Sequence, residues 1–279
     1  MSKSILIMSF LDLNGIQTYY EIKGQGIPLI FVHGGFVNSS MWKPQIEYFS
    51  KYYQVITYDI RGHGKTGITN EKNYSIELFA DDLSALIKQL QLEKPIICGL
   101  SLGGMIAQSF AVKYPDELSA LILSDTAVST ALTFWDKVMV YILYPKWLML
   151  LFLRLFGVKN FIKFSFSIAK LSRGKKWLGN EEIIDYEKNE MLKLDKKEYL
   201  KIFGAIYDFR KQLLSKIKVN TLILAGENES KSVLKHTRHL HELISQSQMR
   251  IIPSAGHMTN LENPEEFNSA KKDFLNKLK

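Results

Sequence analysis

A serine between closely spaced glycines constrains the fold of this chain more than any other feature. The stretch GLSLGG occupies residues 99–104. It follows the short apolar run 95–99 (PIICG), which is typical of a strand buried on both faces, and it precedes residues with helical spacing. The chain must therefore reverse sharply at Ser101, which would hold this residue in a strained conformation with its hydroxyl above the sheet edge. Gly99 and Gly103 leave room for the strand and the helix to approach each other.

Apolar runs that alternate with helical patterns indicate a mainly parallel sheet. The dipeptide Asn14-Gly15 between two strand-like runs predicts an N-terminal hairpin, because both residue types tolerate positive φ. Further strands are expected at residues 28–33, 54–59, 95–99, 118–125, 221–226 and 249–254. Buried strands that alternate with helices form parallel sheets covered on both faces. Right-handed crossovers would then bring the loops that follow the strands to one edge of the sheet.

Two more motifs follow predicted strands, as the serine does. HGG occupies residues 33–35 after PLIFV, and SAGH ends at His257 after RIIP. With these motifs and GLSLGG, the chain resembles the α/β-hydrolase superfamily over nearly its whole length, in the branch of serine esterases and cofactor-free haloperoxidases. The resemblance implies an α/β fold with a mostly parallel eight-stranded sheet, helices on both faces and a helical cap inserted after strand 6. It also implies the chain order serine, acid, histidine.

The resemblance assigns the nucleophile and the base. Ser101 would attack a carbonyl carbon and form an acyl-enzyme that water later cleaves. A serine here argues against the haloalkane dehalogenase and epoxide hydrolase branches, whose nucleophile is a carboxylate. Near neutral pH the hydroxyl needs a base, and His257 lies in a segment similar to the superfamily's histidine loop and last helix. His33 and His63 lie in motifs (HGG, DIRGHG) that resemble structural turns, and we expect them to hold loops.

The acid departs from the superfamily pattern. Relatives usually place an aspartate three residues beyond the glycine that ends the strand TLILAG, and here that position is Glu229. A glutamate can orient a histidine and stabilise its cation. Asp125 is the alternative acid, because it follows the strand LSALILS and a minority of relatives take their acid from there. Glu227 is a third candidate.

The resemblance also places the donors that would stabilise a developing oxyanion. The backbone N–H of Leu102 lies at the start of the helix after the serine, where the helix dipole favours negative charge. The second donor is expected at Gly35, with Phe36 close behind it.

The region between the sixth and seventh predicted strands differs in composition. Residues 126–215 contain long helical stretches rich in Phe, Leu, Trp and Lys, and no strand candidate. We therefore assign residues 1–127 and 216–279 to the core and residues 128–215 to the helical cap. Within this insertion, Pro145 can begin and Gly157 can end a helix that is apolar on nearly every side.

Three uses of the insertion are consistent with its sequence. Its apolar faces can pack on the core and line a hydrophobic acyl pocket while its lysines stay solvated. It can instead rest on an anionic membrane surface or receive lipid-like acyl substrates, because residues 137–176 carry basic residues and no Asp or Glu. It can also form a dimer contact, so both a monomer and a homodimer remain open.

Charge and cysteine content limit the other partners and the compartment. The net charge of +8 does not indicate a nucleic-acid partner, because the excess is local and no nucleic-acid-binding signature accompanies it. The single cysteine, Cys98, falls inside a predicted strand and cannot form an internal disulfide. The N-terminal run MSKSILIMSF is too short for a signal-peptide core. We expect a cytoplasmic protein.

These observations predict a serine hydrolase that cleaves a carboxylic ester of a small-molecule acyl substrate and uses no cofactor or metal ion. Hydrolysis of a thioester or lactone, or a perhydrolase side reaction, remains open within the same class. A ligand-sensing signalling protein with slow turnover on the same scaffold is the alternative from another class, because a fold alone does not fix a function.

Overall fold

The computed structural model describes residues 6–278, and within this range eight strands form one sheet. Residues 1–5, which belong to the run predicted not to be a signal peptide, lie outside the described residues. The strand order is β1-β2-β4-β3-β5-β6-β7-β8. The strands are β1 (Leu6–Leu13), β2 (Ile16–Lys23), β3 (Pro28–Val32), β4 (Gln54–Tyr58), β5 (Ile96–Leu100), β6 (Ala120–Ser124), β7 (Asn220–Gly226) and β8 (Ser247–Ile252).

Most neighbouring strands are parallel. The pairs β3–β4, β3–β5, β5–β6, β6–β7 and β7–β8 are parallel, whereas β1–β2 and β2–β4 are antiparallel. The predicted hairpin is confirmed, because Asn14 (φ 51°) and Gly15 (φ 78°) connect β1 to β2 with both residues in the left-handed region. The predicted mostly parallel eight-stranded sheet is confirmed as well.

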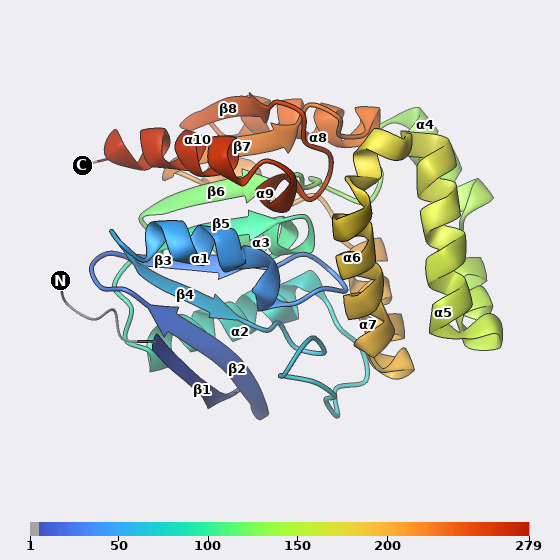
Figure 1. Ribbon diagram of the computed structural model, residues 1–279, viewed down its shortest axis with the longest axis horizontal. Helices are drawn as coiled ribbons and strands as arrows, with labels where there is room; N and C mark the ends of the chain where they lie inside the picture. Colours follow the sequence, from blue (N-terminus) through green and yellow to red (C-terminus); the bar gives the residue numbers. More distant parts are fainter. Residues whose placement is uncertain (1–5, 279) are drawn as a thin grey trace.

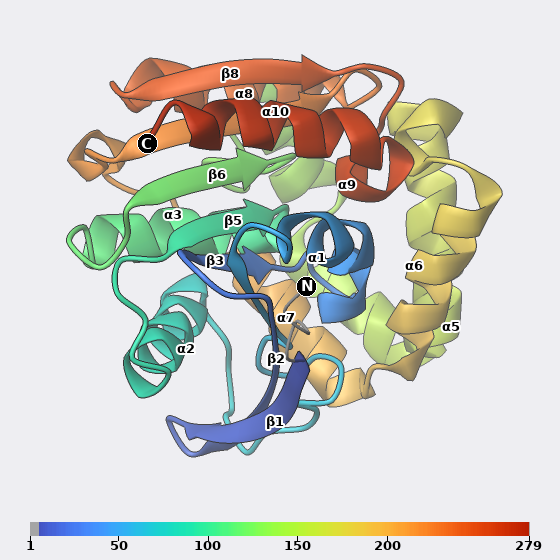
Figure 2. The same cartoon turned by 60° about the vertical axis from the view of Figure 1, so that its left-hand side comes forward.

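Helices cover both faces of the sheet (Figure 2). One apolar core lies between the sheet and α2 (Ile76–Gln89), α3 (Leu102–Lys113) and α8 (Lys231–Leu243). The other lies between the sheet and α1 (Lys43–Phe49) and α10 (Pro264–Asn276). Successive residues of the central strands alternate between the two cores. On β5, for example, Ile97 packs in the first core and Cys98 in the second. The remaining elements of this part of the fold are three short helices: η1 (Ser39–Trp42), η4 (Leu214–Lys216) and α9 (Thr259–Glu262).

The chain between β6 and β7 is helical. Its elements are α4 (Phe134–Lys137), η2 (Val138–Leu143), α5 (Lys146–Arg173), η3 (Lys175–Leu178), α6 (Glu181–Lys193) and α7 (Lys196–Tyr207). They stand at the end of the sheet toward which the parallel strands point, and α5 is the helix farthest from the sheet (Figure 1). We call residues 128–215 the helical insertion.

Two helices meet at Gly157 within α5. The backbone of Gly157 (φ 76°, ψ 170°) is not helical, and a second helix follows the kink. The kink lets both halves of α5 contribute to a small apolar cluster of the insertion, in which Leu153 and Phe161 pack with Tyr199 of α7. The predicted helix end at Gly157 is therefore confirmed, because the first of the two helices stops at this kink.

Buried polar groups connect the insertion to the core. Glu198 of α7 is buried, accepts a hydrogen bond from the Tyr74 hydroxyl, and forms an ion pair with Lys201 at 2.5 Å. Glu190 of α6 accepts a hydrogen bond of 2.6 Å from Asn38 in the loop after β3. These contacts hold α6 and α7 against the loops at the carboxyl edge of the sheet.

Two glycines allow α3 to pack closely on the strands. A Cβ atom at Gly103 would lie 2.1 Å from the carbonyl oxygen of Val32, and one at Gly99 would lie 2.2 Å from the carbonyl oxygen of Gly103. Both distances are far below van der Waals contact, and both involve backbone atoms that cannot rotate away. Any side chain at these positions would therefore push α3 away from β3 and β5.

We predict that Gly103→Ala lowers the free energy of unfolding by about 1–3 kcal/mol through overpacking. Gly204→Ala on α7 is the matched control, because its nearest neighbour outside the helix is the Lys146 side chain at 3.8 Å. This control should be neutral or stabilising by up to about 1 kcal/mol, since alanine favours helix. Urea denaturation of the three proteins measures both effects. Equal stability of both variants would contradict the close packing at Gly103.

Candidate functional site

Ser101 lies on the sharp turn between β5 and α3. Its backbone is in an unusual conformation (φ 54°, ψ −114°). The turn is fixed by its neighbours: the Ser101 N–H donates to the carbonyl of Ser124 at 3.0 Å, and the Thr126 hydroxyl donates to the carbonyl of Ser101 at 2.7 Å. Because β6 and its following loop hold the strained turn from both sides, the side chain of Ser101 is presented in one direction.

His257 and Glu229 complete a hydrogen-bonded chain with this serine. His257 lies in the loop after β8, and its Nε2 atom is 3.1 Å from Ser101 Oγ. Its Nδ1 atom is 2.6 Å from Glu229 Oε2, in the loop after β7. A neutral imidazole can thus donate from Nδ1 to the carboxylate and accept the serine proton at Nε2. Three residues that are far apart in the sequence meet at the carboxyl edge of the sheet.

Glu229 is held in a buried position by further donors. Its Oε1 atom accepts the backbone N–H of Ser230 at 2.6 Å and the indole N–H of Trp177. Burial by itself raises the pKa of this carboxyl, but the adjacent His257 and the hydrogen bonds outweigh burial and lower the pKa below its ordinary value. Glu229 therefore stays ionised beside the imidazole.

Asp125, the alternative acid, has other contacts. Within residues 6–278 its hydrogen-bond donors are the Gly226 N–H at 2.9 Å, the Ser124 hydroxyl at 2.6 Å and the Thr259 hydroxyl at 2.5 Å. None of these bonds reaches His257. Burial and the nearby Glu229 raise the pKa of Asp125 to about 7. This residue joins the ends of β6 and β7 to the loop that carries His257.

The third candidate acid lies outside the hydrogen-bonded chain. Glu227 is exposed, and its Oε2 atom accepts the backbone N–H of Ser254 at 2.9 Å. The geometry therefore favours Glu229 over both alternatives.

The sequence analysis missed Trp177, which lies in η3 of the insertion and contacts His257 and Glu229. Its backbone carbonyl accepts the N–H of His257 at 3.2 Å, and its ring lies 5.0 Å from the imidazole ring. Its indole N–H donates to Glu229. A Cβ atom at Gly256 would lie 2.6 Å from the Trp177 carbonyl, so the histidine loop passes directly under this segment. No sequence pattern marks Trp177, because its role depends on how the insertion folds back over the sheet.

The carboxylate beside His257 also sets its protonation. Burial by itself lowers the pKa of His257, but Glu229, with a smaller contribution from Asp125, reverses this effect and raises the pKa to about 9. The imidazolium is therefore stabilised. A group that must hold a proton transiently and then release it gains from this stabilisation.

The expected oxyanion donors lie beside the serine. Leu102 is the first residue of α3. A Cβ atom at Gly34 would lie 3.8 Å from the Cβ of Ser101, and one at Gly35 would lie 3.5 Å from a methyl group of Leu102. The loop that contains Gly35 and Phe36 thus runs alongside the turn of the nucleophile. Phe36 has a positive φ of 66°, and its ring stacks on Tyr199 of α7 at 4.2 Å.

His33 and His63 are buried away from this chain of hydrogen bonds. His33 Nε2 accepts the backbone N–H of Ile60 at 2.9 Å, and its Nδ1 atom is 2.7 Å from the carbonyl of Gly34. Burial lowers the pKa of His33 to about 4 and that of His63 to about 3. Both rings are therefore neutral and connect loops, as the sequence predicts.

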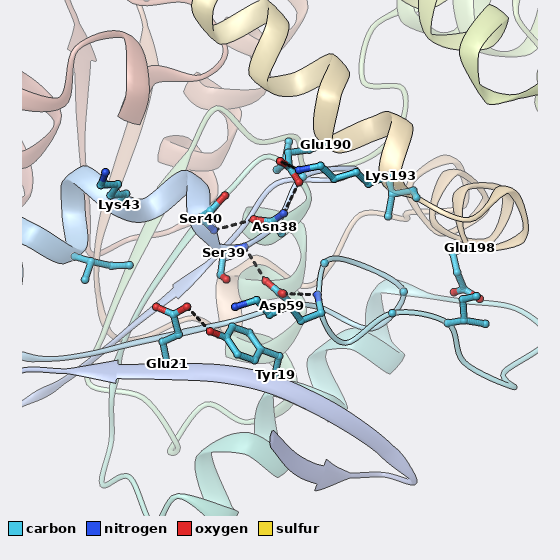
Figure 3. A pocket seen from close by; sticks show the side chains of 18 of the residues that line it. Tyr19, Glu21, Asn38, Ser39, Ser40, Lys43, Asp59, Glu190, Lys193 and Glu198 are labelled. Carbon is cyan, nitrogen blue, oxygen red and sulfur yellow. Dashed lines mark hydrogen bonds and ion pairs between the residues drawn. The ribbon is translucent and has the colours of Figure 1, made fainter. Parts of the chain in front are cut away.

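A cleft of about 890 Å³ lies between the insertion and the loops after β3 and β4 (Figure 3). Several of its polar groups bind one another: Asp59 accepts the backbone N–H groups of Ser39 and Lys65, and Glu190 binds Asn38 and Lys193. Ser101, His257 and Glu229 are not among its lining residues. In the described part of the chain, no group of three or more His, Cys, Asp or Glu side chains could hold a metal ion.

Known proteins share this architecture. A family model described as alpha/beta hydrolase fold matches residues 27–264. The chain is 28% identical to 3-oxoadipate enol-lactonase 2 of Acinetobacter baylyi over 87% of this chain and 86% of the relative. It is 30% identical to the AB hydrolase superfamily protein YisY of Bacillus subtilis over 94% and 96% of the two chains. The solved structure of a thermophilic esterase from Thermogutta terrifontis, with malate bound, has a TM-score of 0.80 at 26% identity and 99% coverage of both chains.

We predict that Glu229→Gln lowers the pKa of His257 from about 9 to below its ordinary value of 6.5, because burial then acts without an adjacent carboxylate. Asp125→Asn should lower this pKa less, since its carboxylate makes no hydrogen bond to the imidazole. NMR titration of the His257 ring nitrogens measures the shift. An unchanged midpoint in Glu229→Gln would contradict the assignment of Glu229 as the main partner.

Proposed function

Because the chain belongs to the α/β-hydrolase family, we propose that it is a serine hydrolase that cleaves carboxylic esters through an acyl-enzyme intermediate. The observation that carries this proposal is the hydrogen-bonded chain from Ser101 through His257 to Glu229. The names of its relatives support the reaction class, because an esterase and an enol-lactonase both act on an ester bond.

In the acylation step, Ser101 Oγ attacks the ester carbonyl carbon while its proton moves to His257 Nε2. The Oγ–C bond forms, and the carbonyl π electrons move onto the oxygen. Glu229 stabilises the imidazolium that results. Collapse of the tetrahedral intermediate then breaks the bond to the alkoxy group, which leaves as an alcohol with the proton from His257.

The negative charge on the tetrahedral oxygen requires donors that already point at it. We assign this role to the backbone N–H of Leu102 and to a second N–H from Gly35 or Phe36. The position of Leu102 at the N-terminus of a twelve-residue helix supports the assignment, because the helix dipole favours negative charge there.

In the deacylation step, His257 removes a proton from water, and the resulting hydroxide attacks the acyl carbon. The acid product leaves with one oxygen from water, and Ser101 recovers its proton. Both steps use the same base, so a single imidazole with a stabilised cation serves the whole cycle.

We propose that the helical insertion acts as a cap and supplies a hydrophobic surface for the acyl group. Apolar side chains of α7 adjoin the site: a Cβ atom at Gly35 would lie 3.1 Å from Ile206 Cδ1, and Tyr199 stacks on Phe36. The contacts of Trp177 with His257 and Glu229 support a direct connection between the cap and the reacting residues.

Lactone hydrolysis is the second candidate. The similarity to an enol-lactonase over 87% of the chain favours it. A lactone is an internal ester, so the same residues would open its ring, and the alcohol would stay attached to the acyl group.

We predict that the protein turns over p-nitrophenyl esters with acyl chains from C2 to C12, and that Ser101→Ala reduces kcat by at least about 10⁴-fold. Initial rates across the series measure the length of the acyl pocket, and simple lactones are assayed beside them by acid release.

Stopped-flow kinetics separate enzyme from receptor. Sustained turnover supports the proposal, whereas one burst per chain followed by near silence would indicate the ligand-sensing alternative. Equal rates for wild type and Ser101→Ala would overturn the assignment of the nucleophile.

We predict that Glu229→Gln lowers kcat by about 10²–10⁴-fold, because the imidazolium loses its stabilising carboxylate. Asp125→Asn should lower kcat far less and mainly destabilise the fold, since its bonds are to Gly226, Ser124 and Thr259. Steady-state rates measure kcat of both variants, and equal mild losses in the two would count against Glu229 as the acid.

In the wild type, kcat/KM should rise with pH through about 9, because only the deprotonated His257 can accept the serine proton. Steady-state rates measured against pH test this prediction.

A further inference from the structure

Exposed apolar side chains gather on the outer side of the helical insertion. They come from α4, η2 and the first half of α5, which follow one another along the chain, and α4 and α5 lie at the edge of the molecule (Figure 1). We call this group the apolar face; its members are Phe134, Trp135, Tyr141, Ile142, Leu143, Trp147, Leu148, Leu151, Leu155 and Phe156. The exposed fraction is 71% for Phe134 and for Trp135, and 69% for Leu155.

The apolar face is not needed for packing within the chain. The first half of α5 already packs through Met149 and Leu153, which are buried in the apolar cluster of the insertion. Trp147, Leu151 and Leu155 recur at four-residue intervals on the outward side, where a helix of a water-exposed surface ordinarily carries charged residues. An accumulation of exposed apolar side chains of this kind marks a site of contact with something else.

The charged residues that α5 and the segment before it contribute beside the apolar face have one sign. Residues 137–176 contain basic residues and no Asp or Glu. Lys137, Arg154, Lys159 and Lys163 are exposed. The nearby acidic groups are engaged: Asp208 pairs with Lys146, and Asp136 accepts the Ser232 hydroxyl at 2.7 Å and caps α4. Within residues 6–278, Lys137, Arg154, Lys159 and Lys163 form no ion pair, so they give the apolar face a positively charged border.

We propose that the apolar face and its basic border form a docking surface for an anionic phospholipid membrane. Tryptophan and tyrosine favour the boundary between headgroups and acyl chains, where Trp135, Tyr141 and Trp147 would lie. Lysine and arginine at the border would contact the acidic headgroups, each contributing to binding that weakens with salt.

The helices would lie in the plane of the membrane surface. In the described part of the chain, no single helix is long and apolar enough to cross a bilayer, although α4–η2 and α5, bent by 43°, meet the criteria of length and composition as a pair. Lys146 and Arg154 divide the apolar stretch of α5, and its inner side is already packed on α7. Such an element enters the headgroup region with one side only.

The charge distribution favours a lipid surface over a second copy of this chain. In a two-fold symmetric dimer through the apolar face, each basic border would meet the other border. Residues 137–176 of each copy offer no carboxylate to neutralise it. An anionic membrane supplies the missing charge.

The test uses full-length protein carrying Ser101→Ala, so that vesicle lipids stay intact and the result does not depend on the proposed hydrolysis. Co-sedimentation is measured with vesicles of phosphatidylcholine alone and with 30% phosphatidylglycerol. We expect sedimentation with the anionic vesicles at low salt, little with the neutral ones, and loss at high salt.

Matched variants locate the contact. Leu155→Ser should reduce binding, whereas Leu213→Ser should not, because Leu213 has a similar exposed fraction (59%) but lies outside the apolar face. Lys159→Glu with Lys163→Glu should weaken partitioning at least about ten-fold. Lys51→Glu with Lys218→Glu should have little effect, because these exposed lysines precede β4 and β7 at the opposite edge of the sheet.

Tryptophan fluorescence gives a second readout. Vesicles with brominated acyl chains should quench the emission of Trp135 and Trp147, and the double variant with Phe at both positions should lose this quenching. Trp42, which is buried, and Trp177, which contacts His257, serve as internal controls. The proposal is overturned if the protein does not sediment with anionic vesicles, or if the variants of the apolar face and the control variants bind equally. It is also overturned if sedimentation equilibrium shows a dimer that Leu155→Ser dissociates while no vesicle binding is observed.

Discussion

The close approach of α3 to β3 and β5 determines where Ser101 can point. Gly99 and Gly103 lack the Cβ atoms that would strike backbone oxygens, so strand and helix meet with no room to relax. The residue between them then adopts a left-handed conformation that a serine would otherwise avoid. Contacts from Ser124 and Thr126 keep it there. The close packing of α3 on β3 and β5 thus fixes the position of Ser101, which we propose as the nucleophile.

A second constraint acts on the imidazole. His257 sits between a hydroxyl and a buried carboxylate, and the carboxylate raises its pKa although burial alone would lower it. Glu229 remains ionised because the adjacent His257 lowers its pKa, with smaller contributions from the Ser230 N–H and from Arg173 of the helical insertion. The helical insertion therefore takes part in the electrostatics of the site, and a rearrangement of η3 would change both the orientation and the basicity of His257.

The two sides of the insertion have different physical characters. The inner side, formed by α7 and η3, packs on Phe36 and on the histidine loop. The outer side, formed by α4, η2 and α5, exposes aromatic and aliphatic side chains among lysines. If the outer side contacts lipid, as we propose, little more than one layer of helices separates the lipid from the site. This arrangement suits an acyl substrate that is itself apolar.

The sequence by itself determined the elements whose signals are local. Apolar runs located the strands, Asn14-Gly15 located the hairpin, and the glycines around Ser101 required the sharp turn, because backbone conformation and burial pattern depend on neighbouring residues. Which carboxylate reaches His257 was decided only by the tertiary structure. Glu229 and Asp125 both follow strands at the same edge of the sheet, and side-chain length with three competing donors directs Asp125 elsewhere. The role of Trp177 and the exposure of the apolar face likewise depend on how a long helical segment folds back on itself, and contacts between residues so distant in sequence leave no local pattern.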